Sequence, residues 1–324
     1  MGIIRKSVIG LEMDSREIRA VEIRGSVKNP EISAWGQIDL PEGIVKDGRV
    51  TNVQLLSTYL DKLINQNKFK SKDVFLGINN QDVIIRFASF PKVPDDKVRN
   101  MIMFQAQEFI PVSLDDLQLD YVIVGEKQNE EGTFINVILV GARKKMLHDF
   151  IDAITGAKLL VREIDSSMLA FGRAALSSVN VNAFAVVGFN YDIANIMIFN
   201  KGIMSMARSV SFSQSSIWAN KRGNDVNNEP ARGSIQIADI LIGELRSSIG
   251  YYRMQSEDAI DGIYLIGKSG LREIAEKFRE AEYEVNILQP YIDIAFKDSS
   301  NGLNTFKTND YTVAVSLALR GLEG

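Results

Sequence analysis

The sequence predicts an α/β protein with a duplicated, two-lobed core and a smaller subdomain inserted in the first lobe. Short apolar strand-like segments alternate with amphipathic helices along the 324 residues. A strand–turn–strand pattern at residues 8–23 recurs at residues 185–199, and a segment rich in both kinds of element separates the two copies. With 45% hydrophobic and 24% charged residues, the chain has enough apolar side chains to bury a sizeable core.

The two hairpins carry polar residues at matching positions. In the first copy an apolar run ends at Glu12, and Asp14 and Ser15 turn the chain into a second apolar run. Gly188 and Asn190 stand at the positions of Glu12 and Asp14 in the second copy. Gly, Asn and Asp are the residues that tight turns favour. Two such hairpins facing each other form a cleft that clamps nucleotide phosphates, and with the insert they fit a bilobed actin-like fold, a duplicated ribonuclease-H-like architecture.

Between the hairpins, apolar runs and helical spacing predict the following elements in order. We expect a strand at 31–40, a helix that Thr51 or Asn52 caps, strands at 74–78 and 83–87, and a helix at 95–110 that stops at Pro111. Strands at 119–125 and 133–142, a helix at 144–156, a strand at 159–164 and a helix from Ser166 or Ser167 to Leu176 follow.

The second half repeats this alternation. The pattern predicts the hairpin at 183–208, a solvated loop at 213–234, a helix at 235–252, a strand at 263–266, a glycine turn at 267–270, a helix at 271–281 and a last helix at 311–319 ending on Gly321. The predicted first lobe is therefore 1–31 with 143–180 and 305–324, the inserted subdomain is 32–142, and the second lobe is 181–304.

Composition excludes several classes of function. The formal net charge is −4 and no basic stripe is present, so we expect no nucleic-acid ligand. Without cysteine there are no disulfides, thiolate metal sites or cysteine nucleophiles, and the one histidine, His148, follows a charged helix start where a solvated side chain is expected. No apolar run reaches the roughly 18 residues that span a bilayer, and residues 1–7 lack a signal peptide's apolar stretch. We therefore expect a cytoplasmic protein without direct membrane insertion.

Several motifs resemble one family. Residues 8–23 are similar to the opening of PilM, the actin-like cytoplasmic protein of type IV pilus assembly. The same resemblance covers Asn79-Asn80-Gln81-Asp82 within 77–87, Glu108-Phe109-Ile110-Pro111 within 105–114, and the segments 244–252 and 314–322. Similarity to the division protein FtsA is weaker.

The resemblance implies two activities. PilM-like proteins bind ATP with Mg²⁺ between two lobes. They also capture the N-terminal cytoplasmic tail of PilN, a single-pass inner-membrane protein, and so connect the pilus motor to the membrane-embedded inner-membrane components. The implied location is the inner face of the cytoplasmic membrane, reached through protein partners.

The same resemblance implies a nucleotide site, in which Glu12 lies near the metal. The implied nucleotide-binding residues are Glu12, Asp14, Ser15, Gly188, Asn190, Glu244, Ser248, Gly267, Ser269 and Gly270. Three of them depart from the family pattern, because Asp14 and Asn190 replace the usual turn glycines and Gly188 replaces the usual aspartate. No catalytic residue is assigned, and hydrolysis is expected to be weak or absent. Without the resemblance, Glu12 and Asp14 are read as a charged hairpin tip.

The predicted helix at 95–110 is the candidate surface for the partner's tail. Phe104 lies off its apolar stripe, where a simple amphipathic helix carries a polar residue. Candidate peptide contacts are Phe104, Glu108, Phe109 and Ile110, with core packing as the alternative for Phe109.

The leading hypothesis is thus a pilus-assembly scaffold that binds a PilN-type tail, with ATP as a structural ligand. The alternatives are an active ATPase of the same fold that drives or regulates pilus assembly and an FtsA-like division protein. A sugar kinase on this fold needs a catalytic aspartate, and none stands out.

Overall fold

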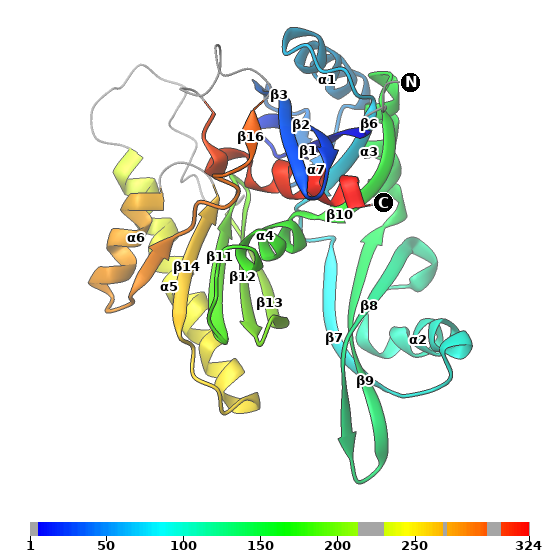
Figure 1. Ribbon diagram of the computed structural model, residues 1–324, viewed down its shortest axis with the longest axis vertical. Helices are drawn as coiled ribbons and strands as arrows, with labels where there is room; N and C mark the ends of the chain where they lie inside the picture. The colour runs from blue at the N-terminus through cyan, green and yellow to red at the C-terminus, as the bar shows by residue number, and fades with distance from the viewer. Residues whose placement is uncertain (1–5, 213–229, 268–270, 297–305, 324) are drawn as a thin grey trace. The chain divides into compact units, whose positions relative to one another are not determined.

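The two hairpins lie in two separate sheets that share the order of five strands, and the first sheet has one further strand at its edge. A computed structural model describes residues 6–212, 230–267, 271–296 and 306–323 (Figure 1). The first sheet has the order β10-β6-β1-β2-β3-β16. Its strands are β1 (Lys6–Met13), β2 (Glu17–Ser26), β3 (Asn29–Asp39), β6 (Asp73–Ile78), β10 (Leu160–Ser166) and β16 (Ala295–Phe296).

The second sheet, written in the same direction as the first, has the order β15-β14-β11-β12-β13, which corresponds to β10-β6-β1-β2-β3. Its strands are β11 (Ala183–Phe189), β12 (Ile193–Asn200), β13 (Ile203–Ser211), β14 (Gly262–Gly267) and β15 (Val285–Ile287). In the first sheet β1, β2 and β3 are antiparallel neighbours, and β6 pairs with β1 in parallel. In the second sheet β11, β12 and β13 are antiparallel neighbours, and β14 pairs with β11 in parallel. The registers match as well, with Met13 opposite Ile18 and Phe189 opposite Ala194. The duplicated α/β fold that the hairpins predicted is therefore confirmed.

Two helices lie between these sheets, α7 (Thr312–Glu323) on the first and α4 (Ser167–Leu176) on the second (Figure 1). α7 contacts β1, β2 and β6 as well as α4. Close approach is possible because strand glycines face the helices; a Cβ built on Gly10 would lie 1.8 Å from the Ala314 carbonyl oxygen. The last helix runs beyond the predicted end at residue 319 and through Gly321, where the missing side chain leaves room for the Phe75 ring.

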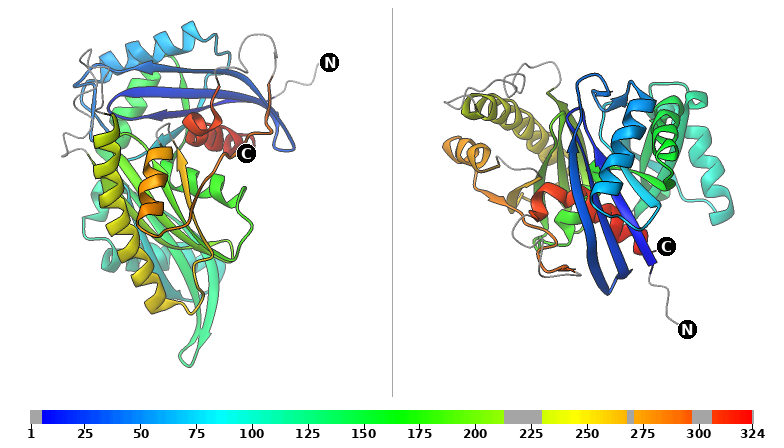
Figure 2. Two further views of the ribbon diagram at one scale, coloured as in Figure 1. Left: turned by 90° about the vertical axis from the view of Figure 1, so that its left-hand side faces the viewer. Right: turned by 90° about the horizontal axis from the view of Figure 1, so that it is seen from above.

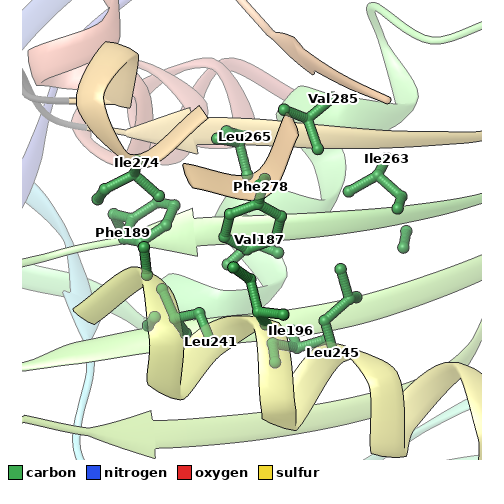
Figure 3. Close-up of a cluster of buried hydrophobic side chains, with 14 of the residues drawn as sticks. Val187, Phe189, Ile196, Leu241, Leu245, Ile263, Leu265, Ile274, Phe278 and Val285 are labelled. Carbon is green, nitrogen blue, oxygen red and sulfur yellow. The ribbon is translucent and has the colours of Figure 1, made fainter. Parts of the chain in front are cut away.

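The outer face of the second sheet is covered by α5 (Pro230–Gln255) and α6 (Leu271–Glu280) (Figure 2). Figure 3 shows the core that they close, in which Leu241 and Leu245 of α5 and Phe278 of α6 meet the strand residues Val187, Ile196 and Leu265. α5 begins five residues before the predicted position, so 230–234 of the predicted loop are helical and 213–229 lie outside the described residues.

α1 (Val53–Gln66) packs on β3 of the first sheet. Asn52 caps it as predicted, since its side chain accepts a hydrogen bond from the Leu55 amide at 3.0 Å. The Ser57 hydroxyl donates to the Ala153 carbonyl at 2.8 Å and so joins α1 to the end of α3 (Lys144–Gly156). Short strands β4 (Val45–Lys46) and β5 (Arg49–Val50) precede α1, and the 3-10 turn η3 (Thr308–Tyr311) precedes α7.

A smaller compact unit, Gln81–Ile151, has its own core. Its sheet has the order β7-β9-β8, built from β7 (Ile84–Pro91), β8 (Leu117–Asn129) and β9 (Gly132–Arg143). The helix α2 (Asp95–Phe109) packs on one face of this sheet through Val98, Ile102 and Ala106, and the 3-10 turn η1 (Leu114–Asp116) leads into β8.

The predicted inserted subdomain, residues 32–142, starts earlier in the chain than this smaller unit. β3, α1 and β6 fall within that range, but β3 and β6 belong to the six-stranded sheet of the larger unit, Met1–Asn80 with Asp152–Gly324. A strand's local pattern shows that it is a strand, whereas the sheet it joins is decided by pairing with residues far away in sequence. None of the helices in the described ranges is long and apolar enough to cross a membrane.

Candidate functional site

The candidate site lies where the two hairpin turns meet, at the ends of β1 and β11. Each turn is closed by the same backbone hydrogen bond, from the Asp14 amide to the Glu17 carbonyl and from the Asn190 amide to the Ile193 carbonyl, both at 3.1 Å. The Asp14 carboxylate accepts further hydrogen bonds from the Arg16 and Glu17 amides at 2.9 and 3.1 Å. Neither Asp14 nor Asn190 has a positive φ. Each turn therefore forms without the glycine that the family pattern has at this position.

The two turns are joined directly by Ser15 and Asp192. One oxygen of the buried Asp192 carboxylate accepts from the Ser15 amide at 2.8 Å, and the other accepts from the Ser15 hydroxyl. Beside this pair the Arg16 guanidinium lies 5.2 Å from the centroid of the Tyr191 ring. Burial raises the pKa of Tyr191, and the Asp14 carboxylate adds to that rise against the lowering effect of Arg19 and Arg16.

The Ser15–Asp192 pair has a chemical consequence for an anionic ligand. A backbone amide and a hydroxyl on a tight turn are the donors that bind phosphate oxygens. Here both donors already bind a carboxylate, which is itself an anion with two acceptor oxygens. A phosphate reaching Ser15 must therefore displace Asp192. Asp192 stands where the first hairpin has Arg16, and no pattern in the sequence links it to the first turn.

Gly188 occupies the place where the family pattern has an acid, and the structure shows what fills the space. A Cβ built on Gly188 would lie 2.7 Å from Cδ2 of Phe171, a buried residue of α4. Opposite Gly188 on β12 is Asn195, which is fully buried. Its amide donates to the Asn79 side chain at 3.2 Å and accepts from the Ser209 hydroxyl at 2.9 Å. An aromatic ring and neutral amides thus lie where a metal-facing carboxylate is expected.

The predicted metal ligand, Glu12, is buried at the end of β1, opposite Arg19. Arg19 is also buried, forms an ion pair with Glu17 and donates to the Asp310 carbonyl at 2.7 Å. Within the described residues, no group of three or more His, Asp or Glu side chains is arranged to hold a metal ion. Of the two acids in the family pattern, Glu12 is present and the one at Gly188 is missing. Mg²⁺ bound with a nucleotide takes one or two carboxylates together with phosphate oxygens, so Glu12 would hold the metal only together with the phosphates.

Restoring the missing acid gives a direct test of this packing. Gly188→Asp is expected to destabilise the fold by about 3 kcal/mol, because the new side chain meets the Phe171 ring and buries a polar group. Adding Phe171→Ala should relieve the clash, so the double variant should lose at least about 1 kcal/mol less than the sum of the two single losses. Urea unfolding of the four proteins measures this coupling, and strictly additive losses would contradict the contact.

The other predicted nucleotide-binding residues lie at two places in the second lobe. Glu244 of α5 pairs with Arg208, Oε2 to Nη1, at 2.5 Å. Ser248 is fully buried and its hydroxyl donates to the Glu244 carbonyl at 2.7 Å, which commits it to the helix. Gly267 ends β14 with φ of +124°, and a Cβ there would lie 2.5 Å from the Phe189 carbonyl oxygen, so only glycine fits. Ser269 and Gly270 lie outside the described residues.

The four predicted peptide contacts differ in exposure. Phe104 is 85% exposed, and with Met103, Gln107 and Glu108 it lines a shallow hollow of about 480 Å³ on α2. Phe109 packs edge-on against Phe90 with ring centroids 5.3 Å apart. Ile110 is 2% exposed and belongs to the core of the smaller unit. As folded, α2 offers Phe104 and Glu108 to a ligand, whereas Ile110, just after the end of the helix, packs in the core.

Two sheets of the same strand order, facing each other across α4 and α7 with their hairpin turns in contact, define an actin-like protein. The family model described as type IV pilus assembly protein PilM matches residues 10–224, so the chain belongs to the PilM family.

Comparison with solved structures agrees on the fold. The protein in a structure described as the PilM–PilN type IV pilus biogenesis complex matches with a TM-score of 0.80 and 20% identity, covering 98% of this chain and 99% of that one. The ethanolamine utilization protein EutJ from Carboxydothermus hydrogenoformans matches with a TM-score of 0.55 and 13% identity, covering 97% of this chain and 89% of its own. No curated protein sequence matches the chain.

Proposed function

We propose that this member of the type IV pilus assembly family is a scaffold rather than an ATP-driven motor. The observation that carries the proposal is the closed site: Asp192 holds the phosphate-binding donors of Ser15, and Phe171 fills the place of the second acid. Phosphoryl transfer depends on positioned metal and phosphate ligands. ATP with Mg²⁺ is in this view a structural ligand that binds only when the Ser15–Asp192 pair opens.

The partner that we propose is the N-terminal cytoplasmic tail of a PilN-like single-pass inner-membrane protein. The family match and the fold shared with the protein of the PilM–PilN complex support it. Phe104 supplies a large exposed apolar side chain of the kind that anchors interfaces, and Gln107 and Glu108 beside it supply hydrogen-bonding groups. Binding this tail would hold the protein at the inner face of the cytoplasmic membrane beside the other pilus components.

The peptide proposal predicts a large effect of charge at one position. Phe104→Glu should weaken binding of a synthetic PilN-type tail at least about tenfold, because it replaces an apolar anchor by a charge. Asn100→Glu, one turn earlier on the exposed side of α2, is the matched control and should bind as the parent does. Isothermal titration measures both. Equal affinity of Phe104→Glu and the parent would remove α2 from the binding surface.

The nucleotide part is tested separately by titration with Mg-ATP and by steady-state phosphate release. We expect no steady turnover, and tighter nucleotide binding by Asp192→Asn, in which the pair that closes the site is weakened while both Ser15 donors are kept. Steady turnover that is lost in Glu12→Ala would instead support the active ATPase. Titrating tail and ATP in all pairings adds a check, because any coupling between the two sites must be reciprocal.

A further inference from the structure

The outward face of α5 carries large apolar side chains that the fold does not bury. Ile240, Tyr251 and Met254 are 42%, 51% and 85% exposed, and they lie on one side of the helix. The opposite side, with Leu241 and Leu245, closes the core of the second lobe (Figure 3). Figure 2 shows α5 at the surface of the larger unit. A surface helix normally carries polar residues on its outer face, so this stripe indicates a contact with another molecule.

Two glycines in the same stripe also indicate a contact with another molecule. Gly243 and Gly250 lie inside α5 without a positive φ, and no described atom lies within 4 Å of a Cβ built on either. Each glycine destabilises a helix by about 0.5–1 kcal/mol relative to alanine. Neither the backbone nor any described neighbour in the same chain requires these glycines. They do allow close approach by a second surface.

The order of residues along the stripe is self-complementary about Ser247. Ile240 and Met254 are equally far from it on either side, as are Gly243 and Tyr251. We propose that the outer face of α5 pairs antiparallel with the same face of a second copy of this chain, around a two-fold axis at Ser247. Ile240 then packs on Met254 of the other copy, and the Tyr251 ring lies over Gly243, where no side chain blocks it. A two-fold interface is isologous, so each of these contacts occurs twice.

Charge along one edge of the stripe supports the antiparallel direction. Asp239 and Arg253 are exposed on the same flank of α5, near opposite ends of the stripe. The two-fold axis of the antiparallel pair keeps this flank of both copies on the same side of the interface and brings Asp239 of one copy near Arg253 of the other. In a parallel two-fold pair the same flanks would lie on opposite sides of the interface, and the two charges would not meet. Near the axis, Arg246 faces Arg246 of the other copy, and the two positive charges repel each other. The Nε of Arg246 lies 3.4 Å from the Tyr283 hydroxyl of its own chain, which holds the guanidinium away from the axis.

The stripe is short, which sets the expected strength of the pair. From Ile240 to Met254 the helix rises about 21 Å, and one such face buries less than the roughly 800 Å² per partner of a standard interface. We therefore expect a reversible dimer with a dissociation constant of about 10 μM, visible as a concentration-dependent mass. The surface is separate from the proposed tail-binding helix α2, so the outcome of either test leaves the other open.

Cysteine cross-linking of the full chain tests register and direction, because the native sequence has no cysteine. Ser247→Cys should form a disulfide-linked dimer under mild oxidation, and an equimolar mixture of Ile240→Cys and Met254→Cys should form the mixed dimer. Asn65→Cys, exposed on α1, is the control and should remain monomeric. If Ile240→Cys formed homodimers efficiently and the mixed dimer did not form, the pair would be parallel and the proposed direction would be wrong. If Ser247→Cys formed no more disulfide-linked dimer than the control, the proposal would be overturned.

Sedimentation of uncross-linked protein gives an independent measurement. Gly243→Leu should raise the dissociation constant at least about tenfold by filling the space that Tyr251 of the other copy needs, while it stabilises the helix itself. Arg272→Leu adds the same side chain at an exposed position of α6 and should leave the dimer unchanged. A parent protein that is monomeric throughout the concentration series, or a Gly243→Leu dimer as strong as the parent's, would overturn the pairing.

Discussion

Gly10→Ala is expected to destabilise the protein by at least about 4 kcal/mol, the range of the most disruptive single substitutions. A Cβ on Gly10 would lie 1.8 Å from the carbonyl oxygen of Ala314, 2.7 Å from its carbonyl carbon and 2.9 Å from the Ala318 amide nitrogen. All three atoms belong to the backbone of α7, so no side-chain rotation relieves the clash. α7 must move off β1, and the fully buried Leu317 moves with it. Urea unfolding followed by far-ultraviolet circular dichroism measures the loss.

Gly36→Ala is the matched control for this prediction. Gly36 lies on β3 of the same sheet, and a Cβ there would also be too close to a neighbour, at 2.4 Å. The neighbour is the end of the Asn67 side chain, which can rotate away at the loss of its hydrogen bond to the Leu63 carbonyl. We expect a loss of about 1 kcal/mol. Similar losses for the two variants would show that α7 does not pack on β1 as closely as described.

Much of this fold is predictable from the sequence because its signals are local. Apolar runs around polar turns identified both hairpins, and the capping residue Asn52 identified the start of α1. The repeat predicted a duplicated architecture before any pairing was known, because two hairpins with one pattern adopt one register. The sheet to which β3 and β6 belong was not predictable in this way, since strand pairing joins residues that are distant in sequence.

The candidate site was less predictable because its chemistry depends on contacts between the two lobes. The sequence showed that Gly188 is not an acid, but it could not show that the Phe171 ring fills the space. Likewise Ser15 was a candidate phosphate ligand by position, and only the fold brings Asp192 to it. Ile110 and Ser248 have side chains that suit a binding site, yet both are buried. Residue type indicates what a group can do, and tertiary packing decides whether a ligand can reach it.

A buried carboxylate in the first sheet carries the second large prediction. Glu22 of β2 is 3% exposed and accepts four hydrogen bonds. One oxygen accepts from the Ser7 and Ser33 hydroxyls at 2.9 and 2.8 Å, and the other from the Lys70 and Ser71 amides at 2.6 and 3.1 Å. Glu22 therefore binds the loop between α1 and β6 to the strands β1, β2 and β3. This loop leads into the strand that carries Asn79 to the candidate site.

Glu22→Ala is expected to cost about 3 kcal/mol, because it leaves two backbone amides and two hydroxyls without their charged acceptor. Glu22→Gln is the sharper comparison. Its carbonyl oxygen can still accept from the two amides and its NH₂ group can donate to the hydroxyl oxygens, so the expected loss is about 1 kcal/mol. Urea unfolding gives both values, and hydrogen exchange at the Lys70 and Ser71 amides should accelerate in the alanine variant well before global unfolding. If both variants were as stable as the parent protein, the four hydrogen bonds of the carboxylate would contribute nothing to stability, and the loop would be held by packing alone.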